Sequence, residues 1–171
     1  MDMKTLFIPV IVALLSVNIS QGQENKNELP FSPNYSSKIQ IGNPEHVRIV
    51  LNFWKDWDNN TMENSNEKFD DSIMVLLSSG RFIQGKSNLI STRSAAREEI
   101  LTVKSTVDVW VPLYITDKNE WLVALWGSQN ITRKDGSKVT QLINEIWRIN
   151  KAGKVNMIRQ YTGMPPGTVK D

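Results

Sequence analysis

The chain has 171 residues, which suits one ordinary domain, and its 20 basic and 18 acidic residues leave a net charge of +2. This balance argues against a dedicated nucleic-acid surface, because phosphate binding needs clustered Lys and Arg. The nearest cluster, Arg93 to Arg97, is followed by Glu98 and Glu99, and we interpret it as a solvated helix face. The lack of cysteine excludes disulfides, thiolate metal sites and a lipoprotein anchor.

The first 22 residues have the pattern of a secretory signal peptide. An apolar run from Thr5 to Val17 follows Lys4, and small residues at Ser20 and Gly22 predict cleavage after residue 22. The run is shorter than the about 20 residues that span a bilayer, so no membrane span is expected after cleavage. An exported chain without cysteine fits a bacterial periplasmic or secreted protein.

Helical patterns follow a polar segment at residues 23–42, which we interpret as a flexible arm or linker. Asn43-Pro44-Glu45 is a helix start, and apolar residues then recur at helical spacing to about Asn59. A short helical piece is predicted at residues 63–69. A third helix is expected after Gly85 with Ser87 as its cap and one face that carries Leu89, Arg93, Ala96 and Ile100.

Strand patterns dominate the rest of the chain. Short extended runs are predicted at residues 72–77 and 81–84, and a long strand at residues 106–115 should place Val107, Val109 and Val111 on one side. Three more strands are predicted at residues 121–132, 139–149 and 154–162, joined by turns at Asp135-Gly136 and Gly153. Together these elements predict an α+β domain at residues 43–163, a curved antiparallel sheet wrapped over about three helices, with a flexible tail at residues 164–171.

Several short motifs, in this order and spacing, resemble the NTF2-like superfamily, specifically its SnoaL-like and ketosteroid-isomerase-like branch. The resemblance extends from about Glu45 to Thr162. Its motifs are Phe-Trp-Lys-Asp-Trp-Asp-Asn-Asn from Phe53, Phe-Asp-Asp-Ser from Phe69, Arg-Phe-Ile-Gln-Gly-Lys from Arg81, Asn-Glu-Ile-Trp-Arg-Ile from Asn144, Gly-Lys-Val from Gly153, and Arg159-Gln160-Tyr161. The resemblance implies a cone with a deep apolar pocket between the concave face of the sheet and the helices.

Matching the two turns to the family implies which residues line this pocket. Glu145 is expected to point inward, together with Ile143, Trp147 and Ile149, because side chains alternate along a strand. Leu142, Ile146 and Ile131 are expected on the outer, convex face, where such proteins commonly form homodimers; cover by the arm at residues 23–42 is the alternative. The other expected lining residues are Phe53 and Trp57, then Trp126, Ser128 and Asn130, and finally Ile158, Gln160 and Thr162.

Departures from the family's pattern imply that its known reactions do not carry over to this chain. Glu145 matches the acid of the ketosteroid-isomerase oxyanion hole, but the position of its tyrosine partner is Phe53, which has no hydroxyl group. The position of the general base is about Leu76, and the acid that other branches carry on the last strand is replaced by Gln160.

Three functions remain open from the sequence. The first is binding of a small, largely apolar ligand with a polar group, oriented by Glu145 and Gln160 and contacted by Trp57, Trp126 and Trp147. The second is an isomerase, dehydratase or cyclase in which Glu145 is the general acid or base, because burial disfavours its charged form. The third is a dimeric protein-interaction module that uses the convex face.

Structural roles are the alternative for several of these residues. Glu145 could simply be tied to Ser128, Asn130, Gln160 or an arginine, and the tryptophans could belong to the core. His46, the single histidine, is expected at the surface, and Asp70-Asp71 to cap a strand, so no metal site is predicted. No cofactor is predicted either.

Overall fold

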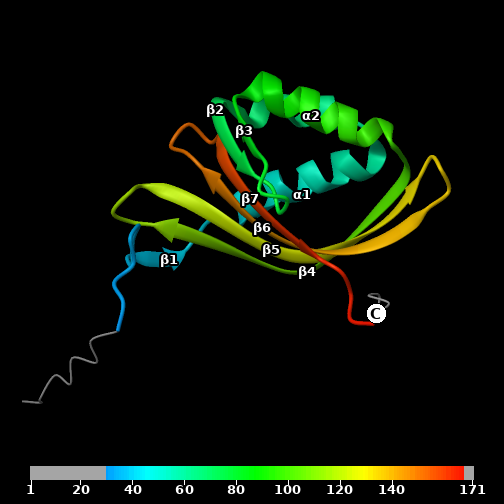
Figure 1. The fold of residues 1–171 in the computed structure, drawn as a ribbon. Coiled ribbons are helices and arrows are strands. Elements are labelled where there is room, and N and C mark those ends of the chain that lie inside the picture. Colours follow the sequence, from blue (N-terminus) through cyan, green and yellow to red (C-terminus); the bar gives the residue numbers. More distant parts are fainter. Residues whose placement is uncertain (1–29, 168–171) are drawn as a thin grey trace, which may run out of the picture. The chain divides into compact units, whose positions relative to one another are not determined.

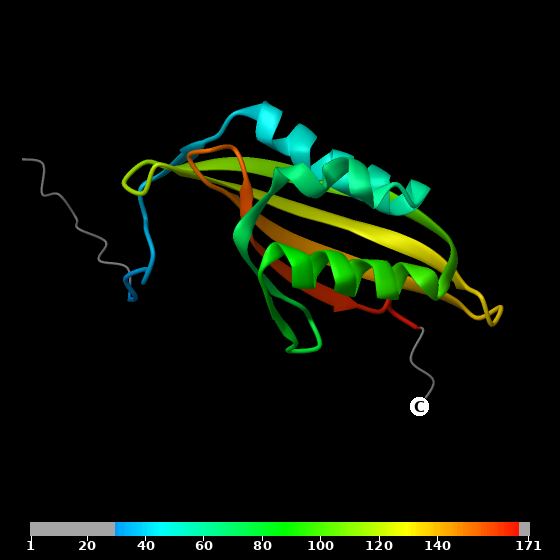
Figure 2. The ribbon, with the colours of Figure 1, turned by 90° about the horizontal axis from the view of Figure 1, so that it is seen from above.

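Two helices cover one face of a curved seven-stranded sheet in the computed structural model of the chain, and two views of the ribbon show this layering (Figures 1 and 2). The structure describes residues 30–167, so the predicted signal peptide lies outside the described part. Contacts divide the chain into two units, Met1–Ser32 and Pro33–Asp171, and the elements of the described part belong to the second unit. In chain order they are β1 (Ile39–Ile41), α1 (Pro44–Asn59), the 3-10 helix η1 (Met62–Lys68), β2 (Phe69–Leu76), β3 (Phe82–Gln84), α2 (Lys86–Glu98), β4 (Ile100–Ile115), β5 (Glu120–Arg133), β6 (Lys138–Ile149) and β7 (Val155–Gly163).

Helix α1 begins where the sequence predicts. The Asn43 side chain accepts a hydrogen bond from the N–H of Glu45 (2.9 Å), and Pro44 is the first helical residue, where an N–H has no partner within the helix. The helix ends because Asn60 adopts a left-handed conformation with φ at 57°. The apolar stripe faces the sheet, and each fully buried side chain contributes roughly 1.5–3 kcal/mol. Its buried members are Val47, Val50, Phe53 and Trp54.

Helix α2 begins slightly earlier than predicted. Gly85, with φ at 89°, precedes its first residue, Lys86, and no side chain caps the helix, so the predicted cap at Ser87 is wrong. A positive φ favours glycine, because a Cβ atom is strained there. Leu89 and Arg97 of this helix are buried.

The α+β class is confirmed, but the sheet is mixed rather than antiparallel. The strand order is β1-β4-β5-β6-β7-β2-β3, and β2 runs parallel to β7, whereas the other neighbouring pairs are antiparallel. Side-chain alternation identifies a strand and its faces but carries no information on the direction of a neighbour that is distant in sequence. The parallel pair therefore left no signal in the sequence.

Part of the predicted arm is a strand. Ile39–Ile41 pair with Leu113–Ile115 of β4, and the N–H of Gly42 bonds to the carbonyl oxygen of Pro112 (2.9 Å). The side chains of β1 are exposed, so the pairing rests on its backbone, and three residues are too few for alternation to identify a strand.

A β-bulge interrupts the predicted alternation of β4. Val107 lies opposite Gly127 but Val109 lies opposite Trp126, so Asp108 has no partner on β5. Val107 consequently packs against the core, whereas Val109 is exposed. The expectation that both lie on one face is therefore wrong.

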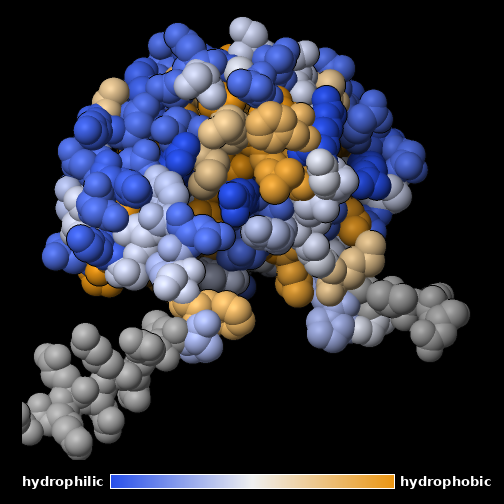
Figure 3. Space-filling model, turned by 60° about the vertical axis from the view of Figure 1, so that its left-hand side comes forward, coloured by the Kyte–Doolittle hydropathy of each residue, from blue (hydrophilic) through white to orange (hydrophobic). Residues whose placement is uncertain are grey.

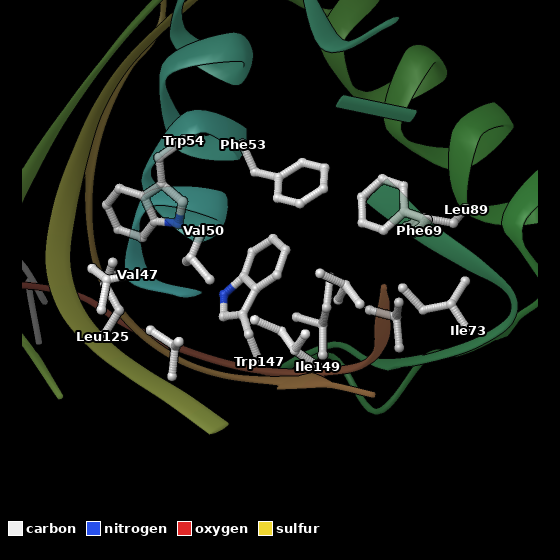
Figure 4. Packing of buried hydrophobic residues seen from close by; sticks show 14 of the residues in the cluster. Val47, Val50, Phe53, Trp54, Phe69, Ile73, Leu89, Leu125, Trp147 and Ile149 are labelled. Atoms are coloured by element: carbon white, nitrogen blue, oxygen red, sulfur yellow. The ribbon is translucent and has the colours of Figure 1, made fainter. Parts of the chain in front are cut away.

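The core fills the space between α1, β2 and the concave face of the sheet (Figure 4). The Phe53 ring stacks on Phe69, with centroids 4.4 Å apart, and on Trp147, with centroids 5.2 Å apart. The indole nitrogens of Trp54 and Trp147 turn toward one another from opposite sides of this space (Figure 4). At the surface, hydrophobic side chains gather near the centre of one face, bordered by hydrophilic ones (Figure 3).

Candidate functional site

A cavity of about 520 Å³ lies between the two helices and the concave face of the sheet. Its walls are mainly apolar and aromatic, with a few polar groups, and its size falls in the range of roughly 300–1,000 Å³ that is usual for small-molecule sites. The apolar walls include Phe53, Trp54, Trp57, Leu89, Trp147 and Ile158, and the polar groups include Arg93, Gln129, Gln141, Glu145 and Gln160.

Glu145 of β6 is the buried acid of this cavity, with 5% of its surface exposed. One carboxylate oxygen, Oε2, accepts hydrogen bonds from the indole N–H groups of Trp54 (2.7 Å) and Trp147 (2.8 Å). The other, Oε1, accepts one from the side-chain amide of Gln160 (2.9 Å) on β7. Elements from both layers therefore fix the carboxyl group in one orientation.

Opposing effects act on the protonation of Glu145. Burial raises its pKa, because a charged carboxylate loses solvation in an apolar surround, whereas the hydrogen bonds from Gln160, Trp54 and Trp147 and the charge of Arg93 lower it. Burial has the largest effect, so the net pKa is raised. Because both indole N–H groups occupy Oε2, a proton on Glu145 would reside on Oε1, beside Gln160.

Arg93 on α2 is the second charged group of the cavity wall. Its guanidinium carbon lies over the rings of Phe53 (5.7 Å from the centroid) and Phe69 (5.1 Å). Burial lowers the pKa of Arg93 to about 10, and the negative charges of Asp56 and Glu145 act in the opposite direction. Arg93 thus remains a cation at neutral pH.

The interpretation of Arg93 to Arg97 as a solvated face is wrong. Arg97 is buried, and its guanidinium donates to the carbonyl oxygens of Ile100 (2.9 Å), Trp57 (3.1 Å) and Asp58 (3.5 Å). Arg93 lines the cavity. The sequence did contain the signal for Arg93, since it shares the apolar face of the helix with Leu89 and Ala96, which also line the cavity.

Seven of the residues predicted to point into the pocket do line the cavity. Glu145 meets Gln160 as predicted, although its other partners, the indole groups of Trp54 and Trp147, were not foreseen. Trp54, Arg93, Gln129 and Gln141 were also missed as lining residues. The predicted residues that line the cavity are Phe53, Trp57, Ile143, Glu145, Trp147, Ile158 and Gln160.

Trp126, Ser128 and Asn130 were also predicted to line the cavity but face the opposite side of the sheet. Thr162 was predicted there too but is exposed and does not line the cavity. Glu145 pairs with Leu125, and Trp126 pairs with Asn144, so the predicted inward set on β5 is shifted by one residue. The same shift brings Ile131 inward, where it lines the cavity, against the expectation that it lies on the convex face.

The hairpin between β5 and β6 explains the shift. The turn at Asp135-Gly136 was matched to the family, and a loop of these two residues alone would have paired Glu145 with Trp126 and given the predicted inward set. The N–H of Arg133 bonds to the carbonyl oxygen of Ser137 (2.9 Å), and Gly136 has φ at 84°, so the loop contains Lys134 as a third residue. One additional loop residue moves every side chain of the partner strand to the other face.

A second, smaller hollow of about 290 Å³ lies on the outer face of the sheet. Val109, Trp126, Asn144 and Tyr161 form a cross-strand row there, opposite the face that carries Glu145. Leu142 borders the same hollow and is exposed, as predicted for this residue.

The described residues contain no group of three or more His, Cys, Asp or Glu side chains that could hold a metal ion. No helix between residues 30 and 167 has the length and apolar character needed to cross a membrane.

Known proteins match the chain in structure but not in sequence. No family model matches, and no curated protein matches either. Among solved structures, a protein from Shewanella denitrificans described as a SnoaL-like polyketide cyclase superposes with a TM-score of 0.59 at 9% identity, over 71% of this chain and 92% of that protein. An NTF2-like protein from Exiguobacterium has a TM-score of 0.56 at 18% identity, over 67% of this chain and 98% of that protein.

A third structure, from Catenulispora acidiphila, has a ketosteroid isomerase-like fold and a TM-score of 0.54 at 12% identity, over 66% of this chain and 83% of that protein. Identities this low establish the fold alone. The chain therefore has the NTF2-like fold of the SnoaL-like and ketosteroid-isomerase-like proteins.

Proposed function

We propose that the chain binds a small, largely apolar ligand that carries at least one polar group. The observation that carries this proposal is a cavity of about 520 Å³ with aromatic walls and a buried, rigidly held carboxyl group. Burial of an acid costs stability. An acid with a purely structural role would not need to border a cavity. Glu145 and Gln160 would orient the polar group, and Phe53, Trp57 and Trp147 would contact the apolar part.

The proposal is tested by closing the cavity from its helix side. Ala96 lines the cavity and is exposed, so Ala96→Trp should fill the space without disturbing the core, whereas Ala95→Trp, at an exposed position that does not line the cavity, is the matched control. The probes are 2-naphthol and 2-acetonaphthone, flat bicyclic molecules with one hydroxyl or one carbonyl group. At about 100 times its Kd, a ligand stabilises a protein by roughly 2.7 kcal/mol.

Wild type and Ala95→Trp should therefore melt about 5–10 °C higher with a probe that binds, and Ala96→Trp should show no shift. Equal shifts in both variants would place binding outside the cavity. Glu145→Gln should change probe affinity by about 5- to 150-fold, since a disturbed buried polar contact costs roughly 1–3 kcal/mol.

A second candidate function is catalysis, favoured by the raised pKa of Glu145. A carboxyl group with a raised pKa can hold a proton closer to neutral pH and transfer it to or from a bound molecule. An isomerase, dehydratase or cyclase would then lose turnover in Glu145→Gln while probe binding persists. A binding protein would show no turnover of any bound probe in the wild type.

A further inference from the structure

Arg93 lines the cavity, and one donor of its guanidinium group is buried among the described residues without a hydrogen-bond partner. Its Nη1 atom is buried and has no hydrogen-bond partner among residues 30–167. In that part of the chain, no carboxylate oxygen lies within 4.0 Å of an Arg93 nitrogen, the limit for an ion pair. The guanidinium group instead lies over the Phe53 and Phe69 rings, on the wall of the cavity.

The nearest candidates for a structural partner are already engaged. Asp56, whose charge acts on Arg93, accepts hydrogen bonds from the hydroxyl groups of Ser65 and Thr61. Glu145 is held by three N–H donors from Trp54, Trp147 and Gln160. Arg93 is therefore attracted by both acids but bonded to neither.

Arg97 shows what a structural arginine looks like on the same helix. One turn further along α2, its three guanidinium nitrogens each donate to a backbone carbonyl oxygen. A buried N–H without a partner costs stability, and Arg93 carries this cost whereas Arg97 does not, which indicates that a further group completes the hydrogen bonding of Arg93.

We propose that Arg93 binds the carboxylate of a small aromatic acid in the cavity, which deepens the proposed function and rests on it. A guanidinium group matches the planar fork of a carboxylate, and the aromatic walls suit a flat ring. A singly charged carboxylate fits better than a phosphate group, because Glu145 and Asp56 already bring negative charge close to Arg93.

The test compares three probes of one shape, 2-naphthylacetate, 2-naphthylacetamide and 2-(2-naphthyl)ethanol, in calorimetric titrations of the full chain. Wild type is compared with Arg93→Met, which keeps the bulk of the side chain, and Arg93→Lys, which keeps the charge. Arg159→Met is the control, since Arg159 is exposed and does not line the cavity. Circular dichroism and thermal melting establish that each variant is folded.

Wild type should bind the acid at least about ten-fold more tightly than the amide or the alcohol, as expected for a charge-assisted hydrogen bond in a buried site. Arg93→Met should abolish this preference and leave the affinities for the amide and the alcohol unchanged within about three-fold. Arg93→Lys should keep part of the preference, and Arg159→Met should keep all of it.

Two results would overturn the proposal, and they differ in their meaning for the proposed function. If the amide and the alcohol bind but the acid has no advantage, or keeps its advantage in Arg93→Met, Arg93 is not the carboxylate site and ligand binding stands. If none of the three probes binds the wild type, the proposal falls together with the proposed function.

Discussion

At the scale of single residues, Glu145 links the stability of the fold to pH. Burial raises its pKa above the ordinary value of 4.5, so the folded state binds its proton more tightly than the unfolded state does. Well below pH 4.5 the carboxyl group is protonated in both states, so its ionisation does not lower stability there. Stability is lost as the pH rises from there through the folded-state pKa.

Glu145→Gln isolates this effect, because glutamine has the same shape and does not ionise. Its side-chain oxygen can accept from Trp54 and Trp147, and a rotated Gln160 amide can accept from its NH₂ group. The unfolding free energy of the variant should gain on that of the wild type as the pH rises from 4 to 8, as urea denaturation would measure. A constant difference between the two proteins across that range would contradict the assignment.

The two arginines of α2 show which parts of the site the sequence could predict. Glu145 and Gln160 were placed correctly because the resemblance to the NTF2-like proteins implied which face of each strand is inward, and side chains alternate from there. Arg93 and Arg97 were misplaced because a charged residue on a helix is usually solvated, and burial of either depends on contacts with distant elements.

At the scale of secondary-structure elements, the register of the central strands determines which side chains reach the cavity. Element types and most boundaries could be predicted from periodicity and from caps such as Asn43. The face of β5 could not, because the loop between β5 and β6 contains one more residue than a two-residue turn at Asp135-Gly136. Bulges, such as the one at Asp108, have the same consequence and arise from packing rather than from a local motif.

Gly127 of β5 is the position where this packing is tightest. A Cβ atom there would lie 2.2 Å from the carbonyl oxygen of Thr106 and 3.1 Å from the ring of Trp54. Gly127→Ala should therefore destabilise the protein by about 3 kcal/mol or more and displace the indole that donates to Glu145. Thermal melting and tryptophan fluorescence would measure both effects.

Gly163→Ala is the matched control on β7. No atom lies within 4 Å of the Cβ atom it would gain, so its stability should stay within about 0.5 kcal/mol of the wild type. Equal melting temperatures for the two variants would show that β5 can move away from Trp54 without cost.

At the scale of the whole molecule, the site exists only in the folded chain. Trp54 and Glu145 lie 91 positions apart in the sequence, and the partner from β7 lies 15 positions beyond Glu145. The helix layer and the sheet must therefore pack together before the carboxyl group has its donors. Ligand binding and global stability should consequently be coupled, because both depend on the same contact between layers.

The outer face of the sheet is the remaining large feature, and we expect it to join two copies of the chain. Trp126, Tyr161 and Leu142 are exposed there around a hollow of about 290 Å³, and exposed apolar groups of this kind indicate a contact surface. The wild type should sediment as a dimer, and Trp126→Lys should shift it to a monomer, because a charge in the centre of an apolar contact loses its solvation. Leu101→Lys, at a similarly exposed apolar residue outside this hollow, should remain dimeric. A wild type that sediments as a monomer, or a Trp126→Lys variant that stays a dimer, would exclude this face as the contact between copies.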